Sequence, residues 1–485
     1  MTPTQNGEHR CAFVIFGASG DLAARKLLPA LFELHLRGAL HPETALVGFS
    51  RRDWSDDTFR ERARAALQEH APKSFDEAAW AELAPRLSFV SGGYDDAEAY
   101  QKLKEHLQNL GQDNRLFYTS TPPSTYAPIA ERLGEAGMAR SAGWVRLIVE
   151  KPFGHDLRSA RMLNETLLKH FREEQIYRMD HYLAKETAQN IAALRFANAL
   201  FEPTWNSQYV DHIQVTMAEP MGMEGRGGFY DEVGVIRDVI QNHLLQLVAL
   251  TATEPPARYD AKSVRDEKVK VFQAMACSNP QHAVIGQYRG DGRVKGYREE
   301  EGVDPRSRQG TYAALELRID NWRWAGVPFF VRSGKRLRAK SSEIVIVYKR
   351  PPHIPFELRA PVQHDRIVLR LQPNEGISLR FNAKKPGQGI SLSRASMDFY
   401  YDKEFRSRNP DAYETLLEDA MMGDATLFMR ADEVEAQWRV VTPLLEAWEA
   451  SYDEPAFYDV GSWGPDEAND LLAKRGRTWH TPAVE

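Results

Sequence analysis

The chain has 485 residues, with 62 basic against 68 acidic side chains and a formal net charge of −6. This length predicts two or more domains, and 42% apolar with 27% charged residues is typical of a globular protein rather than a disordered or fibrous one. The mild negative charge argues against a dedicated nucleic-acid partner or an acidic membrane surface.

The cysteine count and the apolar runs narrow the class of protein further. Two cysteines, Cys11 and Cys277, exclude a disulfide framework and a zinc cluster of the CxxC type, so no metal site is expected. The first ten residues are polar, and the richest apolar run, 244–250, is far shorter than the ~20 residues that span a bilayer. We therefore expect a cytoplasmic protein that does not enter a membrane.

The first third of the chain alternates between short apolar runs and amphipathic stretches. The apolar runs predict strands at 11–17, 44–49, 86–90, 115–120, 144–150 and 175–179. Stretches such as LLPALFELHLRG predict the helices between them. Strand–helix–strand alternation favours a parallel sheet covered by helices, so residues 1–180 are expected to form an α/β domain of the Rossmann type.

A glycine turn follows the first strand and runs into a helix. It reads Gly17-Ala18-Ser19-Gly20-Asp21-Leu22. At this position glycines let the backbone approach a dinucleotide pyrophosphate, and the helix N-terminus supplies N–H donors. The spacing is GxxG without the full GxGxxG, so a tight turn with no ligand is the alternative.

The end of the second strand carries arginines instead of an acid. An NAD site places an Asp or Glu there to accept from the ribose 2′-hydroxyl, whereas this strand ends Ser50-Arg51-Arg52. Paired arginines suit a 2′-phosphate, although a basic pair at a strand end is also commonly only solvated. Together with the glycine turn, they favour NADP, with NAD as the weaker alternative.

A polar cluster follows the sixth strand. Asp180 stands where an N-cap would begin a helix, which would place His181 and Tyr182 in its first turn and Lys185 on the face of His181. Such a cluster at a positive helix end predicts a phosphate site. A capped helix with solvated polar side chains is the alternative.

Residues 181–485 have a different pattern and predict a larger α+β domain. Helical segments at roughly 183–201 and 233–251 flank a strand around 209–217, and a charged helix covers 263–275. From about 283 onward, strand-like runs joined by turns favour a mostly antiparallel sheet. Two further helices near 411–421 and 431–449 precede the end of the chain.

The second helical segment contains a histidine within an apolar stripe. On a helical wheel His243 falls among Ile236, Val239, Ile240 and Leu247. A histidine in this position is either a satisfied core residue or a desolvated general base. Asp238 would point ~140° away on an ideal helix, so the residues alone leave the partner of His243 open.

A basic run follows a strand at 327–331. Residues 332–340 carry five basic side chains and no acidic one, including Lys335 and Lys340. A solvated face is one interpretation, and a sheet rim that points lysines into a cleft is the other.

These motifs together resemble the glucose-6-phosphate dehydrogenase family. The matching blocks span nearly the whole chain in family order: GASGDL, NRLFY with PPSTY, VEKPFG, RMDHYLAKE, AEPMGMEGRGGFYDEVGVIRDVIQNHLLQ, VRSGKRLRAK, LQPNE and TPLLEAW. The resemblance implies a dinucleotide-binding domain, a larger α+β domain whose sheet forms a subunit interface, and a homodimer or homotetramer. It also implies oxidation of C1 of glucose 6-phosphate to the lactone, with NADP taking the hydride.

The resemblance carries roles to individual positions. His243 matches the general base and Asp180 the acid that orients it. The matched substrate contacts are Lys151, His181, Tyr182, Lys185, Glu219, Asp238, Lys335 and Lys340. The matched cofactor positions are Gly17, Ala18, Ser19, Gly20, Asp21, Leu22, Arg51, Gly93, Tyr94, Tyr126 and Lys151. Lys151-Pro152 is a candidate cis peptide.

Two positions depart from the family pattern, Ala24 where a basic residue is frequent and Ala184 where glycine is usual. Neither removes a catalytic group. Two other functions are compatible with parts of the pattern: a different NADP-linked sugar oxidoreductase, since EKP motifs occur there, and an NADP-binding regulator without catalysis. The first leaves His181, Lys185 and Lys340 unexplained, and the second gives no reason for a base at His243.

Overall fold

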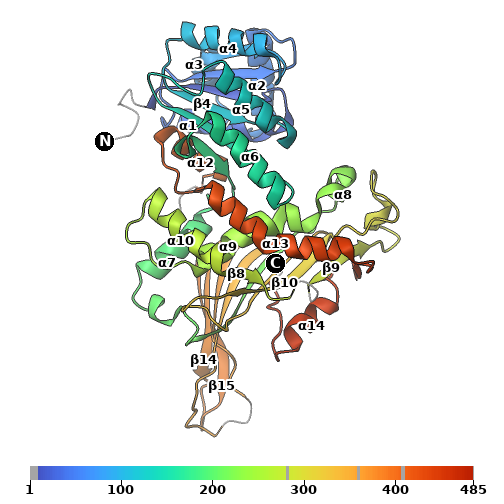
Figure 1. Cartoon of the computed structure of the whole chain (residues 1–485). Helices are drawn as coiled ribbons and strands as arrows, with labels where there is room; N and C mark the ends of the chain where they lie inside the picture. The colour runs from blue at the N-terminus through green and yellow to red at the C-terminus, as the bar shows by residue number, and fades with distance from the viewer. Residues whose placement is uncertain (1–8, 280–282, 358–360, 406–409, 484–485) are drawn as a thin grey trace. The chain divides into compact units, whose positions relative to one another are not determined.

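The computed structural model describes residues 9–279, 283–357, 361–405 and 410–483. Most of the polar N-terminal stretch considered above lies outside these ranges. The chain divides into two compact units (Figure 1). The first comprises Met1–Ala184, Arg258–Arg265 and Pro410–Glu435, and the second comprises Lys185–Ala257, Asp266–Asn409 and Ala436–Glu485.

The first unit is built on a seven-stranded sheet in the order β16-β6-β5-β4-β1-β2-β3. Its strands are β1 (Ala12–Phe16), β2 (Ala45–Ser50), β3 (Leu87–Ser91), β4 (Arg115–Thr119), β5 (Val145–Glu150), β6 (Ile176–Met179) and β16 (Phe428–Met429). All pairings are parallel except that of β16 with β6. This strand order confirms the predicted Rossmann-type fold. The two-residue β16 is too short to leave a periodic signal in the sequence.

Helices of the first unit are fixed by side-chain caps and an apolar core. They are α1 (Leu28–Leu36), α2 (Asp56–His70), α3 (Glu77–Leu83), α4 (Ala97–Asn109), α5 (Tyr126–Glu135), α6 (Leu157–His170) and α12 (Ala412–Met422). Ser55 accepts the Thr58 amide at 3.1 Å to start α2, and Asp156 forms a capping box with Ser159 at α6. Residues from α12 and β16 share the buried core with β1 and α1, so a late segment of the chain completes this unit.

The second unit contains a ten-stranded sheet in the order β15-β14-β13-β12-β7-β11-β10-β9-β17, with β8 paired to β10. Its strands are β7 (Val210–Ala218), β8 (Met275–Cys277), β9 (Val284–Arg289), β10 (Tyr312–Ile319), β11 (Phe329–Gly334), β12 (Ser341–Tyr348), β13 (Arg366–Gln372), β14 (Gly376–Lys384), β15 (Leu392–Tyr400) and β17 (Ala456–Asp459). Most pairings are antiparallel, as predicted, whereas β7 with β11 and β9 with β17 are parallel. Figure 1 shows β14 and β15 as a long hairpin.

Helices of the second unit differ from the prediction at 183–201 and within 233–251. They are α7 (Glu186–Phe196), α8 (Gly227–Val235), the π-helical segment η8 (Ile236–Leu244), α9 (Leu245–Ala252), α11 (Tyr401–Glu404) and α14 (Glu467–Ala473), while α10 (Ala261–Ala274) and α13 (Ala431–Ala450) span the division between units. The predicted helix over 183–201 is wrong at both ends. The Asn198 side chain donates to Leu194 O at 3.1 Å and ends α7 early.

No helix among the described residues combines the length and the apolar character needed to cross a bilayer.

Candidate active site

The glycine turn after β1 lies against the carboxyl ends of two neighbouring strands. Gly17 has a positive φ of 83°, and a Cβ there would lie 2.1 Å from Ser120 O. Its amide donates to Phe49 O at 2.8 Å. Only glycine fits at position 17, because both the backbone conformation and the space exclude a side chain there. The turn therefore presents bare backbone at the edge of the sheet where dinucleotide phosphates bind in this fold.

Two predicted cofactor residues meet at the same edge. Arg51 is exposed at the end of β2, and its guanidinium lies 5.9 Å from the centre of the Tyr94 ring, which follows β3. Burial raises the pKa of Tyr94, so its hydroxyl stays protonated. An exposed guanidinium held over a ring is free at its outer face for a phosphate. Tyr126, in contrast, is 2% exposed and lies near Glu150 inside the first unit.

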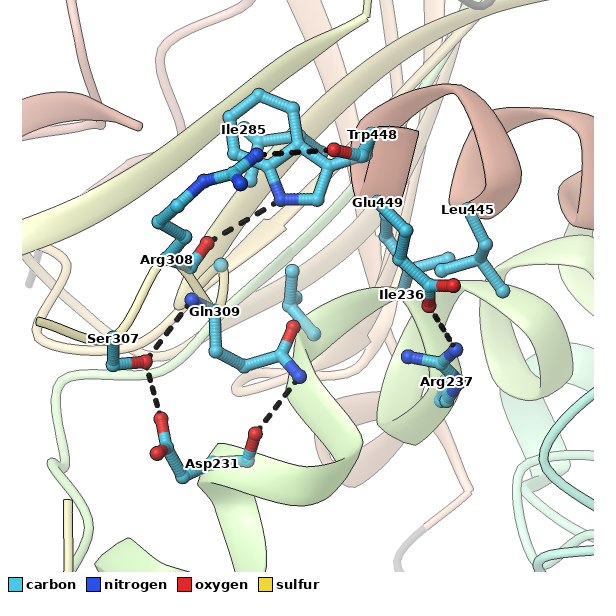
Figure 2. A pocket seen from close by; sticks show the side chains of 12 residues that line it. Asp231, Ile236, Arg237, Ile285, Ser307, Arg308, Gln309, Leu445, Trp448 and Glu449 are labelled. Atoms are coloured by element: carbon cyan, nitrogen blue, oxygen red, sulfur yellow. Dashed lines mark hydrogen bonds and ion pairs between the residues drawn. The ribbon is translucent and has the colours of Figure 1, made fainter. Parts of the chain in front are cut away.

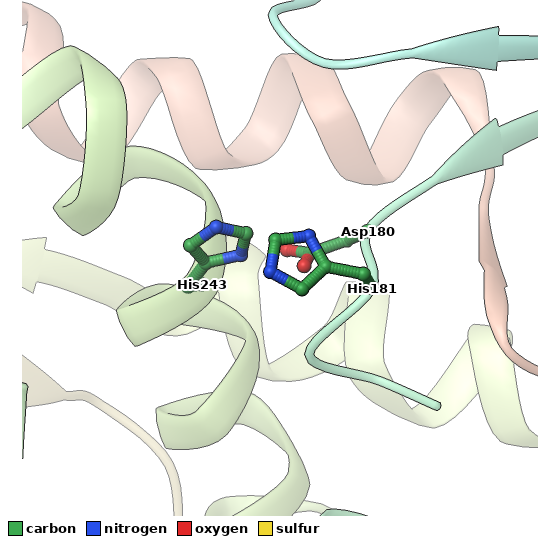
Figure 3. Close-up of side chains that lie close together, drawn as sticks. All are labelled: Asp180, His181 and His243. Atoms are coloured by element: carbon green, nitrogen blue, oxygen red, sulfur yellow. The ribbon is translucent and has the colours of Figure 1, made fainter. Parts of the chain in front are cut away.

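The segment after β6 is a turn, which corrects the prediction that Asp180 caps a helix. Asp180 accepts the Tyr182 amide at 3.0 Å, and Leu183 N–H donates to Asp180 O at 3.1 Å. Helix α7 begins only after Lys185, so Lys185 and His181 do not share a helical face. Figure 3 shows Asp180 and His181 on this turn and His243 on its helix. Asp180 is fully buried, whereas His181 is half-buried.

Lys151 and Asp180 follow two adjacent parallel strands, β5 and β6. Both charges act on the buried carboxyl of Glu150, the last residue of β5, which places the three groups close together. Lys151-Pro152 is cis, as predicted. The carboxyl ends of β5 and β6 therefore gather one cation and two acids at the edge that also carries the glycine turn.

In the second unit, Glu219 and Lys335 are brought together by the parallel pair β7 and β11. Each residue directly follows its strand, and Ala218 lies opposite Gly334 in the register. The Lys335 ammonium forms a short ion pair with the Glu219 carboxylate, and both side chains are partly exposed. The Lys335 backbone is held by Thr311 O at 2.9 Å and by the Tyr458 hydroxyl at 2.8 Å. The arrangement presents a fixed cation and a fixed acid that suit the hydroxyls of a sugar.

Tyr230, on α8, lies beneath this pair and was not identified from the sequence. The Lys335 ammonium is 5.6 Å from the centre of its ring. The side chain is 4% exposed, and among the described residues its hydroxyl has no hydrogen-bond partner. Burial, followed by the nearby Asp238 charge, raises the pKa of Tyr230 well above its usual value. The Lys335 ammonium, which pairs with Glu219, therefore lies over an uncharged phenol ring.

The helix that carries His243 is π-helical over 236–244, which corrects the geometry expected for Asp238. A π-helix joins residues five apart, so Asp238 and His243 lie one turn apart on the same face, and not ~140° apart as on an ideal α-helix. Gly234, with φ of 66°, breaks the helix before this segment, and a Cβ there would meet Gln309 Oε1 at 2.2 Å. The segment packs against β7 and β11, and His243 is 3% exposed.

A pocket of about 290 Å³ lies behind the start of this segment (Figure 2). There Arg237 pairs with Glu449 at 2.7 Å, and Gln309 donates to Asp231 O at 3.0 Å. The first contact holds the Arg237 side chain at Glu449, and the second holds the backbone at Asp231. The chain is therefore anchored on both sides of the Gly234 break.

Three other residues named in the sequence analysis differ in their exposure to solvent. Lys340 is exposed before β12, Lys185 is half-buried at the start of α7, and Ala184 is buried in the core of the first unit. Sequence reasoning missed Tyr413, whose ring stacks on His181 with centroids 6.4 Å apart. Its position far along the chain left no local signal.

Comparisons with known proteins cover both units. The model of the glucose-6-phosphate dehydrogenase NAD-binding domain matches residues 14–190, and that of the C-terminal domain matches residues 192–480. Glucose-6-phosphate 1-dehydrogenase of Aggregatibacter actinomycetemcomitans is 45% identical over 487 residues, covering 98% of each chain. Glucose-6-phosphate 1-dehydrogenase 2 of Mycobacterium tuberculosis is 44% identical, covering 97% of this chain and 95% of its own.

Two solved structures are similar throughout. A glucose-6-phosphate dehydrogenase in complex with its substrate glucose 6-phosphate superposes with a TM-score of 0.91 at 38% identity, covering 97% of this chain and 99% of that one. The enzyme from Mycobacterium avium gives a TM-score of 0.86 at 39% identity, covering 98% and 100%.

Proposed function

The chain belongs to the glucose-6-phosphate dehydrogenase family, and on that premise we propose that it oxidises C1 of glucose 6-phosphate to the lactone, with NADP as the hydride acceptor. The observation that carries the proposal is the match of both family models, which together account for almost the whole chain. The buried His243 and the Lys335 and Glu219 pair supply the chemistry that such a reaction needs.

The reaction separates a hydride from a proton. Bound NADP would supply the acceptor for the hydride that leaves C1, and a ring nitrogen of His243 would take the hydroxyl proton. An imidazole is suited to this step, because a ring nitrogen of its neutral form can accept a proton. Asp180 is assigned to orient the imidazole and to stabilise its protonated form. Its fixed backbone turn supports that role, since the carboxyl is buried and pre-positioned.

Binding of the sugar phosphate is divided between two sets of residues. His181, Tyr182, Lys185 and Lys340 are assigned to the phosphate. Lys151, Glu219, Asp238 and Lys335 are assigned to the sugar hydroxyls. The π-helical turn supports the inclusion of Asp238, because it aligns this carboxylate with His243. The ion pair of Lys335 with Glu219 offers one donor and one acceptor in a fixed relation.

The open backbone at Gly17 and the positive charge of Arg51 suit the assigned cofactor site to NADP. The glycine turn is closed to side chains at Gly17, as close approach of a pyrophosphate requires, and the remaining assigned positions are Ala18, Ser19, Gly20, Asp21, Leu22 and Gly93. Arg51 over Tyr94 supports a 2′-phosphate, since its outer face is exposed. Tyr126 is assigned to the cofactor site by the resemblance, although its side chain is only 2% exposed. Lys151 is assigned to lie beside the nicotinamide.

We further propose that the enzyme acts in the cytoplasm as a homodimer or homotetramer. Sedimentation at working concentration separates a monomer from either assembly.

The activity test follows NADPH absorbance with glucose 6-phosphate and then with glucose. The proposal expects turnover with the phosphate ester and far lower kcat/KM with glucose, because the phosphate-binding side chains would lack their partner. Equal efficiency with both sugars would exclude the phosphate site. No turnover with either would leave an NADP-binding regulator.

A further inference from the structure

The helix break at Gly234 divides one backbone hydrogen bond, and the loop before β10 supplies a partner for each half. In an unbroken α-helix the Val235 amide would donate to the Asp231 carbonyl oxygen, four residues back. At the break the Val235 amide donates to Gly310 O at 3.0 Å. The Asp231 carbonyl oxygen accepts from the Gln309 side-chain amide at 3.0 Å (Figure 2). Two neighbouring residues of one loop thus replace the bond that the helix gives up.

The Gln309 side chain extends from a loop that is itself anchored. Its backbone amide donates to the Ser307 hydroxyl at 3.1 Å, and its backbone carbonyl accepts from the Gln287 side chain at 2.8 Å. The Ser307 hydroxyl donates a short hydrogen bond to the Asp231 carboxylate, which ties the loop to α8 a second time. A Cβ on Gly234 would collide with Gln309 Oε1, so the glutamine amide lies directly against the break.

The break determines where the π-helical segment η8 begins. Val235 is the N-cap of this segment, which packs against β7 and β11. Asp238 and His243 follow within the segment at a fixed spacing. If the segment began one residue earlier or later, both side chains would turn by about a quarter of a turn around the helix axis. The orientation of both groups therefore depends on how the segment starts.

We propose that Gln309 is a positioning residue for the reaction, because its amide fixes the break at Gly234 and thereby the orientation of His243. This inference rests on the proposed function. The effect is transmitted through the backbone of η8 and requires no contact between Gln309 and the substrate. Placement of this kind matters for a general base, since a misplacement of about 1 Å can lower a rate by about 10²-fold.

The role requires a hydrogen-bond donor at position 309. The Asp231 carbonyl oxygen can only accept, and the glutamine amide supplies a donor without a charge. Methionine has a similar length and no donor, and ionised glutamate has the same shape with oxygens that only accept. Loss of the donor leaves the Asp231 carbonyl oxygen without this partner at the break. The Val235 amide can then return to it, which closes the break and shifts the start of η8.

The experiment compares Gln309→Met with the wild type in steady-state assays of glucose 6-phosphate oxidation, with kcat and both KM values measured. The kcat should fall about tenfold with KM for NADP unchanged, because the base is displaced while the cofactor site is not. The same substitution in a His243→Asn background should cause no further fall in kcat, because its effect passes through His243. Asn198→Leu is the matched control. It removes a side-chain amide that donates to a helix-terminal carbonyl at 3.1 Å in the same unit, and it should leave kcat near the wild-type value.

The outcomes separate the inference from the proposed function. If the wild type does not reduce NADP with glucose 6-phosphate, the proposed function fails and the inference falls with it. If the wild type is active and folded Gln309→Met keeps its kcat, the inference alone is overturned. An equal fall in the His243→Asn background or in Asn198→Leu would also overturn it, since the loss would then come from general loosening of the unit. Should Gln309→Met fail to fold, Gln309→Glu decides by itself, because it keeps the shape and removes only the donor.

Discussion

Removal of the Lys335 charge should lower kcat/KM for glucose 6-phosphate but leave the free energy of unfolding nearly unchanged. In Lys335→Met the side chain keeps its apolar stem, so packing over the Tyr230 ring at 5.6 Å is retained while the ammonium is lost. Glu219 then loses its ion-pair partner, but the side-chain exposures of 18% and 38% leave water to solvate it. Partly exposed pairs of this kind contribute about 0–1 kcal/mol, so the free energy of unfolding should change by less than about 1 kcal/mol.

The same variant should lose far more in catalysis. A charged hydrogen bond to a bound ligand contributes about 1.5–3 kcal/mol, which predicts a fall in kcat/KM of roughly 10- to 100-fold for glucose 6-phosphate. Initial rates of NADPH formation and urea unfolding of the same preparations measure the two quantities. Arg338→Met, a change at an exposed basic residue of the same run, is the control and should leave both near the wild-type values. A kcat/KM within twofold of wild type in Lys335→Met would refute the assigned role.

Three further predictions concern other groups. Tyr230→Phe should stabilise the protein by about 1 kcal/mol in urea unfolding, because it removes a buried hydroxyl without a partner; a loss above about 1 kcal/mol would contradict this. Burial raises the pKa of Glu343 to about 7, so its protonated form is favoured on folding and its ionisation costs stability as pH rises from about 4.5 to 7. Glu343→Gln should therefore gain stability relative to wild type over that interval, on the order of 3 kcal/mol by pH 8, and a flat difference across pH would exclude the shift. Arg51→Ala should raise KM for NADP about tenfold and leave KM for NAD unchanged, whereas equal changes for both cofactors would remove Arg51 from the 2′-phosphate site.

Local patterns predicted much of the first unit. A β-branched run followed by Gly17 and a helix leaves a clear signal, since each step depends on neighbours in the sequence. The antiparallel sheet was equally visible from its strand-like runs. β15 was missed, because none of its residues is buried and its apolar alternation is confined to Ala395, Met397 and Phe399.

Errors arose where one residue type serves two local structures. Asp180 has the side chain of an N-cap, but the same carboxyl oxygen also closes an Asx-type turn onto the amide two residues on. The π-helical segment was invisible for a related reason, because its apolar residues satisfy the 3.6-residue period equally well. Asp238 was therefore assigned to the wrong face.

Tertiary contacts explain the remaining gaps. Tyr413 reaches Glu150 and His181 only because α12 returns to the first unit. Tyr230 lies near Lys335 only because α8 and the end of β11, far apart in the sequence, meet in the fold. Neither pairing has a signature within a sequence window.

The central claim is that His243 removes the proton from the C1 hydroxyl. The most direct test is kcat for glucose 6-phosphate in His243→Asn, with His212→Asn, at a second buried histidine of the same unit, as the control. General-base catalysis contributes about 10²–10⁴, so kcat of His243→Asn should fall at least about 10²-fold with little change in KM, and the control should keep its activity. A near-normal kcat in folded His243→Asn would contradict the account.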